Sequence, residues 1–193
     1  ASVLLVGAYE SSSLEDKMAL LDVNVKGAAC VCDVFGTKLA ERRAHGKGAG
    51  LLLVSSLLGI TGARGVALYA ASKAFLTALA VCCFFVSFSS MTITAITINN
   101  NKQGGLWSEW QDKGIAVRAC VLGPVDTPKL REQGVRPDAA PGIMSADEAA
   151  EKCLRTLAGV GPRHVIGWLP AVATVLVERL LPRSLGVAVI SEN

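Results

Sequence analysis

The residues best suited to chemistry are Tyr69 and Lys73, four positions apart in Tyr-Ala-Ala-Ser-Lys, and Ser56, thirteen positions before the tyrosine. In a helix, positions four apart lie on one face, so the Lys73 ammonium would stand beside the Tyr69 phenol. Because a nearby positive charge stabilises phenolate, we expect Lys73 to lower the pKa of Tyr69 toward the range of a working acid or base. With the Ser56 hydroxyl close to the same point, the three side chains predict reduction of a carbonyl group.

Two apolar runs around this motif predict strands that are buried on both faces of a sheet. The first covers residues 48–56 and ends in two serines, and the second covers residues 114–121. Catalytic groups of open α/β sheets gather at the carboxyl ends of the strands, so we expect Ser56 at that edge. Upstream, Ser12 or Ser13 can cap a long helix that reaches about residues 44–46.

In order and spacing, these features resemble the short-chain dehydrogenase/reductase family. The shared elements are an Asn-Val-x-Gly helix segment at 24–27, a strand ending in Ser-Ser, the Tyr-x-x-Ser-Lys sequence, and a strand running into a Pro-Gly-like loop. The resemblance extends from about residue 3 to about residue 185. It implies the α/β fold class, with a Rossmann-like three-layer α/β/α arrangement and a mostly parallel sheet. It also implies an NAD(P)(H)-dependent oxidoreductase that interconverts a carbonyl and an alcohol.

The resemblance assigns four catalytic positions. Ser56 would bind the substrate carbonyl, and Tyr69 would donate its proton. Lys73 would hold the nicotinamide ribose as well as tune Tyr69, and Asn24 would hold a water molecule of a proton relay. The family's spacing favours Ser56 over Ser55, which is left as a strand-end residue whose replacement by alanine we expect to be mild.

The cofactor implied is NAD or NADP, and the sequence does not indicate which. Besides Tyr69 and Lys73, the resemblance assigns cofactor contacts to Gly7, Gly123, Val125 and Thr127. Leu122 stands where the family's loop has proline, which leaves φ of that corner less restricted.

The family's first βαβ half is missing from the sequence. That half carries a strand, a Gly-rich turn and a helix that holds the cofactor's pyrophosphate. The glycines of segment 46–50 precede a strand, so they predict a helix-ending loop and no phosphate site. Residues 3–7 resemble the family's fourth strand, with Leu4 and Leu5 in place of asparagines. We therefore expect residues 1–193 to be a single partial domain with impaired activity that binds neither NADH nor NADPH measurably.

Residues 81–103 interrupt the pattern of the helix that carries Tyr69. Removing them joins Ala80 to Gly104 and restores the family's pattern, and the possible codons of Val81 and Gln103 permit an in-phase intron. We therefore predict that segment 81–103 is a non-native insert. The alternative is a membrane span, because residues 74–101 carry no charge and exceed the length of a spanning helix. Frequent Ser and Thr and a β-branched run at 92–98 oppose the span.

Composition agrees with a compact α/β chain, since hydrophobic residues make up 51% and charged residues 18%. The net charge of +3 and the scattered basic residues predict no nucleic-acid partner. The six cysteines form no Cys-x-x-Cys pair and the two histidines are isolated, so we expect no metal site and free thiols in a reducing compartment. No signal peptide is visible, and we expect a cytoplasmic protein, with membrane association, for example at the endoplasmic reticulum, as the alternative.

The remaining segments predict supporting elements. Ser145 opens a capping box for a helix through Leu157, and residues 163–167 form a short last strand. Residues 128–144 would be the substrate lid, and residues 168–185 a C-terminal amphipathic helix. The ending resembles relatives that act on lipophilic ketones or 3-oxoacyl groups, and an intact member would be a homo-oligomer. Two other functions stay open: a non-catalytic binding or oligomerisation protein, and a membrane-anchored protein that uses residues 74–101.

Overall fold

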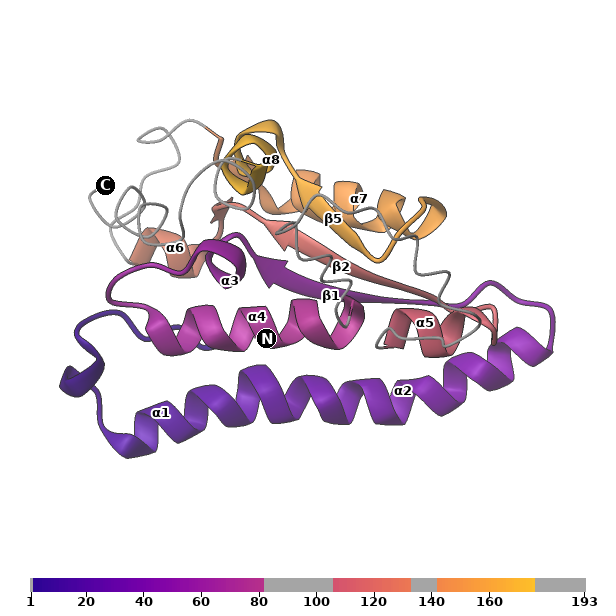
Figure 1. Cartoon of the computed structure of the whole chain (residues 1–193), viewed down its shortest axis with the longest axis horizontal. Coiled ribbons are helices and arrows are strands. Elements are labelled where there is room, and N and C mark those ends of the chain that lie inside the picture. The colour runs from indigo at the N-terminus through magenta and orange to yellow at the C-terminus, as the bar shows by residue number, and fades with distance from the viewer. Residues whose placement is uncertain (1, 82–105, 133–141, 176–193) are drawn as a thin grey trace, which may run out of the picture.

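A parallel sheet with all its carboxyl ends on one edge forms the centre of the molecule (Figure 1). The computed structural model describes residues 2–81, 106–132 and 142–175. The sheet has the order β1-β2-β5, with β1 at Gly50–Ser56, β2 at Ala116–Leu122 and β5 at Arg163–Ile166. Ser56 pairs with Leu122, and Leu122 pairs with Ile166, so the three strands end side by side.

Helices cover both faces of this sheet, as expected for a three-layer α/β/α arrangement (Figure 1). α4 (Ala67–Val81), α5 (Leu106–Gln111) and the longer α2 (Gly27–Ala44) lie on one face, and α7 (Ala146–Arg155) lies on the other. The shorter elements are η1 (Tyr9–Ser11), α1 (Leu14–Leu21), η2 (Asp22–Lys26), α3 (Leu58–Thr61), β3 (Val125–Asp126), α6 (Pro128–Glu132), β4 (Met144–Ser145), η3 (Thr156–Ala158) and α8 (Trp168–Val175).

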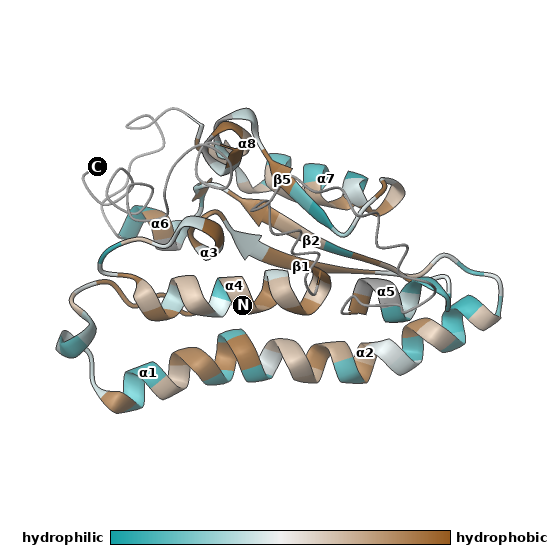
Figure 2. Ribbon diagram, in the orientation of Figure 1, coloured by the Kyte–Doolittle hydropathy of each residue, from teal (hydrophilic) through white to brown (hydrophobic). Residues whose placement is uncertain are grey.

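Each face of the sheet has its own apolar core. Leu53, Val117 and Ala119 pack with Cys32 of α2 and Ala80 of α4 on one face. Residues of α7 pack with Cys120 and Ile166 on the other. In Figure 2, hydrophobic residues run along the strands, while hydrophilic residues collect on α7 and at the end of α2. The predicted fold class, a Rossmann-like α/β fold with a parallel sheet, is confirmed.

The predicted long helix is confirmed, and it contains an irregular turn that the sequence did not reveal. Ser13 caps α1, because its hydroxyl accepts a hydrogen bond of 3.0 Å from the Asp16 N–H. η2 is a π-helical turn between α1 and α2, in which the Gly27 N–H donates to the carbonyl of Asp22, five residues back. π turns of this kind interrupt α-helices locally and often occur at functional sites. Here the turn carries Asn24.

The predicted strand at residues 3–7 is wrong, because these residues adopt no strand. The backbone of Val3 bonds to a side chain instead of a neighbouring strand. Its N–H donates to Asn24 Oδ1 at 2.8 Å, and its carbonyl accepts from Asn24 Nδ2 at 2.8 Å. The side-chain amide of Asn24 thus makes the two backbone hydrogen bonds with Val3 that a neighbouring strand would otherwise make.

The other predicted elements fall largely where the sequence placed them. Ser145 caps α7 by accepting from the Glu148 N–H at 3.1 Å, and β5 coincides with the predicted last strand. α7 ends at Arg155, where the 3₁₀ turn η3 takes over, two residues before the predicted end. α8 forms the start of the predicted helix 168–185, whose remainder lies outside the described residues.

The predicted insert 81–103 lies outside the described residues except for Val81, the last residue of α4. Most of the alternative span 74–101 does too. Among the residues that the structure describes, no helix is long and apolar enough to cross a membrane.

Candidate active site

The carboxyl end of β1 and helix α4 bring Ser56, Tyr69 and Lys73 together. The Ser56 hydroxyl and the Tyr69 phenol share a side-chain hydrogen bond. The Lys73 ammonium lies 5.6 Å from the centroid of the Tyr69 ring and donates to the carbonyl of Val54 at 3.1 Å. The phenol, the hydroxyl and the ammonium therefore converge at the edge where the sequence predicted them.

Close backbone packing holds α4 at this position. α3 follows β1 directly, and the Leu58 N–H donates to Ser56 Oγ at 3.3 Å. A Cβ at Gly59 of α3 would meet the backbone of Lys73 and Ala74 at 2.8 Å, so only glycine lets α3 approach α4 this closely. The Ser72 hydroxyl, which is fully buried, donates to the Tyr69 carbonyl at 2.7 Å.

The pKa of Tyr69 is shifted in the direction opposite to the prediction. Burial raises the pKa of Tyr69, and hydrogen bonds from Ser56 and Ser2 oppose this rise only in part. Burial also lowers the pKa of Lys73, because the residue is only 7% exposed and its ammonium donates to an uncharged carbonyl. The expectation that Lys73 lowers the pKa of Tyr69 is therefore wrong for this structure, since burial of the phenol is the largest cause of the shift and raises its pKa. The phenol is protonated at neutral pH.

The side-chain hydrogen bonds of Asn24 are to Val3 and to Ser72 of α4, and none of them is to the Tyr69 phenol. Asn24 is buried at 4% exposure, and Nδ2 donates to Ser72 Oγ at 3.0 Å in addition to the Val3 carbonyl. Through Ser72, whose hydroxyl binds the Tyr69 carbonyl, Asn24 joins the π turn to the helix of the candidate site. Its predicted role as holder of a relay water remains a prediction.

Ser55 has more contacts than the sequence suggested. Its hydroxyl donates to the Lys73 carbonyl at 2.7 Å and accepts from the Thr77 hydroxyl at 2.7 Å. At 2% exposure it is buried between β1 and α4. Thr77 was not predicted from the sequence as a residue of this site. It lies eight residues after Tyr69 on α4, and the packing of α4 against β1 brings its hydroxyl to Ser55.

The predicted cofactor residues lie in two places. Gly123, Val125 and Thr127 follow the carboxyl end of β2, close to Ser56 through the Ser56–Leu122 pairing. Gly7, with φ of 135°, lies instead beside the loop before α4, where its N–H donates to the Gly65 carbonyl at 2.9 Å.

Local contacts occupy these cofactor candidates in the structure. Gly123 packs so closely on α8 that a Cβ would meet Pro170 Cγ at 2.7 Å. Val125 pairs with Met144 in the small β3–β4 sheet. Thr127 Oγ1 accepts from the Leu130 N–H at 3.3 Å, at the start of α6.

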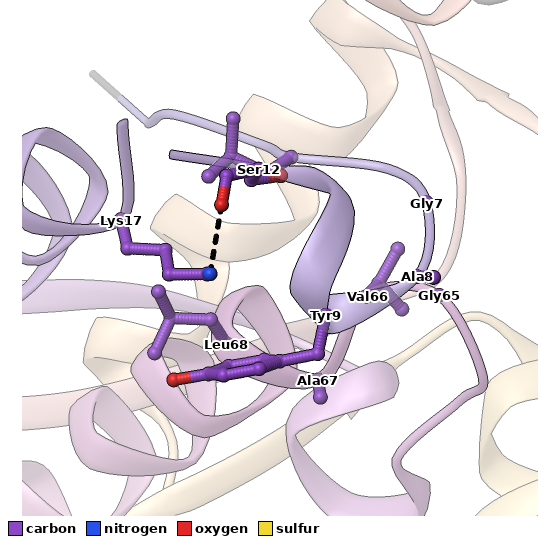
Figure 3. Close-up of a pocket in the computed structure, with 10 residues that line it drawn as sticks. Gly7, Ala8, Tyr9, Ser12, Lys17, Gly65, Val66, Ala67 and Leu68 are labelled. Carbon is purple, nitrogen blue, oxygen red and sulfur yellow. Dashed lines mark hydrogen bonds between the residues drawn. The ribbon is translucent and has the colours of Figure 1, made fainter. Parts of the chain in front are cut away.

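Two hollows flank the site. A cavity of about 20 Å³ lies between the segment around Gly7 and the residues just before Tyr69. Figure 3 shows the residues that line it, among them Lys17, whose ammonium donates to the Ser12 carbonyl. This cavity has room for about one water molecule. An open apolar groove of about 470 Å³ lies on the other face, lined by residues that include Val54, Val125 and Cys153.

The titratable residues outside this site form no second centre in the part of the chain that the structure describes. There, no three His, Cys, Asp or Glu side chains gather as a metal site would require, and the cysteines are free thiols. Cys153 lies beside Cys120, and burial raises the pKa of Cys153 to about 12, so its thiol stays protonated and inert.

Comparison with known proteins gives matches only at the level of structure. No protein-family model and no curated protein matches the sequence. A 7β-hydroxysteroid dehydrogenase matches with a TM-score of 0.67 and 18% identity, covering 98% of this chain and 63% of its own. A short-chain dehydrogenase from Burkholderia cenocepacia in complex with NADP gives 0.68 and 19%, covering 98% and 67%. One from Sphingobium yanoikuyae in complex with NADPH gives 0.63 and 18%, covering 86% and 54%.

The chain thus spans less than two thirds of the length of several of these enzymes. The neighbours whose names state a family are short-chain dehydrogenases. The chain therefore has the fold of the short-chain dehydrogenase/reductases.

Proposed function

We propose that this chain carries the catalytic part of an NAD(P)(H)-dependent oxidoreductase that interconverts a carbonyl and an alcohol. The observation that supports this most directly is the hydrogen bond between Ser56 and Tyr69 beside the buried Lys73 ammonium. Three polar groups of these types, held at the carboxyl edge of a parallel sheet, suit a carbonyl oxygen that must gain a proton. A lipophilic ketone or 3-oxoacyl substrate agrees with the apolar groove that Leu122 and Val125 line beyond the neighbouring strand end.

In the proposed reaction, Tyr69 is the general acid. Its raised pKa keeps the phenol protonated, which is the form that can donate to the carbonyl oxygen during reduction. Ser56 would hold the same oxygen through its hydroxyl. Asn24 would position a water molecule that returns a proton to Tyr69 after the phenol has donated its own. The reverse reaction needs phenolate, so raised pH would favour alcohol oxidation.

The cofactor's place is proposed from the donors that the site offers. A bound nicotinamide cofactor would supply or accept the hydride. The Lys73 ammonium has three N–H donors, of which one bonds to the Val54 carbonyl, so the other two can serve ribose hydroxyls. Gly123, Val125 and Thr127 lie at the neighbouring strand end and would contact the nicotinamide and phosphates. These residues fit the nicotinamide half, and the Gly-rich turn that would hold the pyrophosphate is not in the sequence.

The alternative is a non-catalytic relative that uses the sheet for binding or oligomerisation. The local contacts that occupy Gly123, Val125 and Thr127 favour it, whereas the convergence of Ser56, Tyr69 and Lys73 argues against it.

The experiment compares the chain alone with a hybrid protein in which the chain follows the first βαβ half of the Burkholderia enzyme. Both are assayed on ketones and 3-oxoacyl thioesters by the absorbance of NADH or NADPH. We expect turnover in the hybrid, reduced roughly 10²-fold or more by Tyr69→Phe with cofactor affinity nearly unchanged, because general acid catalysis contributes 10²–10⁴-fold. Lys73→Ala should weaken both. A folded hybrid that binds cofactor without turning over any substrate would favour the non-catalytic alternative.

A further inference from the structure

Three consecutive residues at the end of β1 are each bonded to helix α4. The Val54 carbonyl accepts from the Lys73 ammonium, the Ser55 hydroxyl donates to the Lys73 carbonyl, and the Ser56 hydroxyl bonds to the Tyr69 phenol. Two of these bonds involve groups of the proposed active site. The middle one involves only Ser55 and backbone, and its purpose is not explained by the proposed chemistry.

The Ser55 hydroxyl belongs to a chain of hydrogen bonds with a single direction. Thr77 Oγ1 donates to Ser55 Oγ at 2.7 Å, and Ser55 Oγ donates to the Lys73 carbonyl at 2.7 Å. The contact from Thr77 Oγ1 to that carbonyl is longer, at 3.4 Å. Within α4 the Lys73 carbonyl is already the natural acceptor of the Thr77 N–H, so the Ser55 hydroxyl adds a bond from outside the helix.

Neither hydroxyl can touch a substrate held by Ser56. Side chains alternate along a strand, so Ser55 shares the α4 face with the buried Leu53, while Val54 points to the opposite face and lines the groove. Ser55 is 2% exposed, and its polar contacts are Thr77 and the Lys73 carbonyl. Any effect of the pair on chemistry must therefore pass through the backbone of Lys73 and the neighbouring Ser56.

We propose that Ser55 and Thr77 are positioning residues, whose hydroxyls fix the carboxyl end of β1 to Lys73 of α4 and so hold Ser56 within hydrogen-bond distance of Tyr69. The importance of this for catalysis rests on the proposed function, but the positioning itself does not. Without the Ser55 hydroxyl, the hydrogen bonds left between the strand end and α4 are those of the Lys73 ammonium and of Ser56 with Tyr69, and the proposed function assigns all three side chains to substrate or cofactor. The contact between Ser56 and the phenol then loosens.

The phenol itself reports on this contact. The chain contains two tyrosines, so in a Tyr9→Phe background Tyr69 is the only one. Its titration can be followed by ¹³C NMR of tyrosine labelled at Cζ, with circular dichroism to show that the protein remains folded. Lys73 is the charged group known to face the phenol, and the Ser56 and Ser2 hydroxyls are its hydrogen-bond partners, so all variants keep Lys73 and Ser2 intact.

Ser56→Ala sets the reference, because removal of a hydrogen bond that stabilises phenolate moves the Tyr69 titration to higher pH. We expect Ser55→Ala and Thr77→Val to move it in the same direction by a smaller amount, and Thr77→Ser, which keeps the hydroxyl, to restore the parent curve. Ser145→Ala is the control, since it removes the cap of α7 on the opposite face and should lower stability without moving the titration.

The proposal is overturned if Ser55→Ala and Thr77→Val lower stability as Ser145→Ala does while the Tyr69 titration stays at the parent position. It is also overturned if Thr77→Ser shifts the curve as far as Thr77→Val. The measurement needs neither cofactor nor turnover, so its outcome is independent of whether the hybrid protein reduces ketones.

Discussion

Replacing Asn24 with alanine should detach the N-terminal segment from α4. The side chain makes three hydrogen bonds, two with the Val3 backbone and one with Ser72. At a net 0.5–1.5 kcal/mol for each bond, their loss sums to roughly 1.5–4.5 kcal/mol. Val3 is only half-buried and its groups can return to water, so we expect Asn24→Ala to lower the free energy of unfolding by about 2–3 kcal/mol.

Urea denaturation followed by circular dichroism measures the loss, and hydrogen exchange at the Val3 amide locates it. Asn24→Asp is the matched variant. It keeps an acceptor for the Val3 N–H but turns a carboxylate oxygen toward the Val3 carbonyl and Ser72, so it should be no more stable than Asn24→Ala. A loss below about 0.5 kcal/mol, which is the scale of a single net hydrogen bond, together with an unchanged Val3 exchange rate, would refute the assignment of these bonds.

Three other predictions follow from single contacts. Arg118 is 8% exposed and donates to the carbonyls of Val117, Thr156 and Gly159. A lysine cannot make these forked hydrogen bonds, so Arg118→Lys should lower the free energy of unfolding, measured in urea, by about 2–4 kcal/mol, far more than Arg131→Lys at the surface. Burial raises the pKa of Cys153 from 9.0 to about 12, so the thiol loses its proton at lower pH in the unfolded chain, and the free energy of unfolding should fall as pH rises from 9 toward 12. Cys153→Ala should reduce the slope of the free energy of unfolding against pH, and equal slopes in parent and variant would contradict the burial of the thiol. Gly59→Ala places a methyl against the backbone of Lys73 and Ala74 and should lower the thermal midpoint, whereas Gly48→Ala, which has open space, should not.

Local patterns in the sequence predicted the elements well. The caps at Ser13 and Ser145 each depend on an N–H three residues ahead, and both bonds are present. The strand containing Ser56 was evident because a strand buried on both faces is a continuous apolar run bounded by glycines. Spacing along one helix likewise placed Tyr69 beside Lys73.

Contacts between distant residues could not be predicted in this way. The amide of Asn24 replaces a strand partner of Val3 across 21 positions, so the run at residues 3–7 resembles a strand without forming one. The hydroxyls of Ser55 and Thr77 meet across 22 positions. The pKa of Tyr69 depends on how deeply folding buries the phenol, a quantity that spacing does not contain, and so the sign of its shift was missed.

The π turn at Asp22–Lys26 has a consequence for how this chain can change in length. Such a turn holds one residue more than an α-helical turn, and each residue advances a helix by about 100°. Deleting a single residue there would restore a regular helix and rotate α1 relative to α2, so that the buried Leu20 and Asn24 could no longer both face inward. We expect a one-codon deletion in this turn to be more harmful than most substitutions at its exposed Val23, whereas the same deletion at residues 46–48, an exposed loop, would shift no helical face.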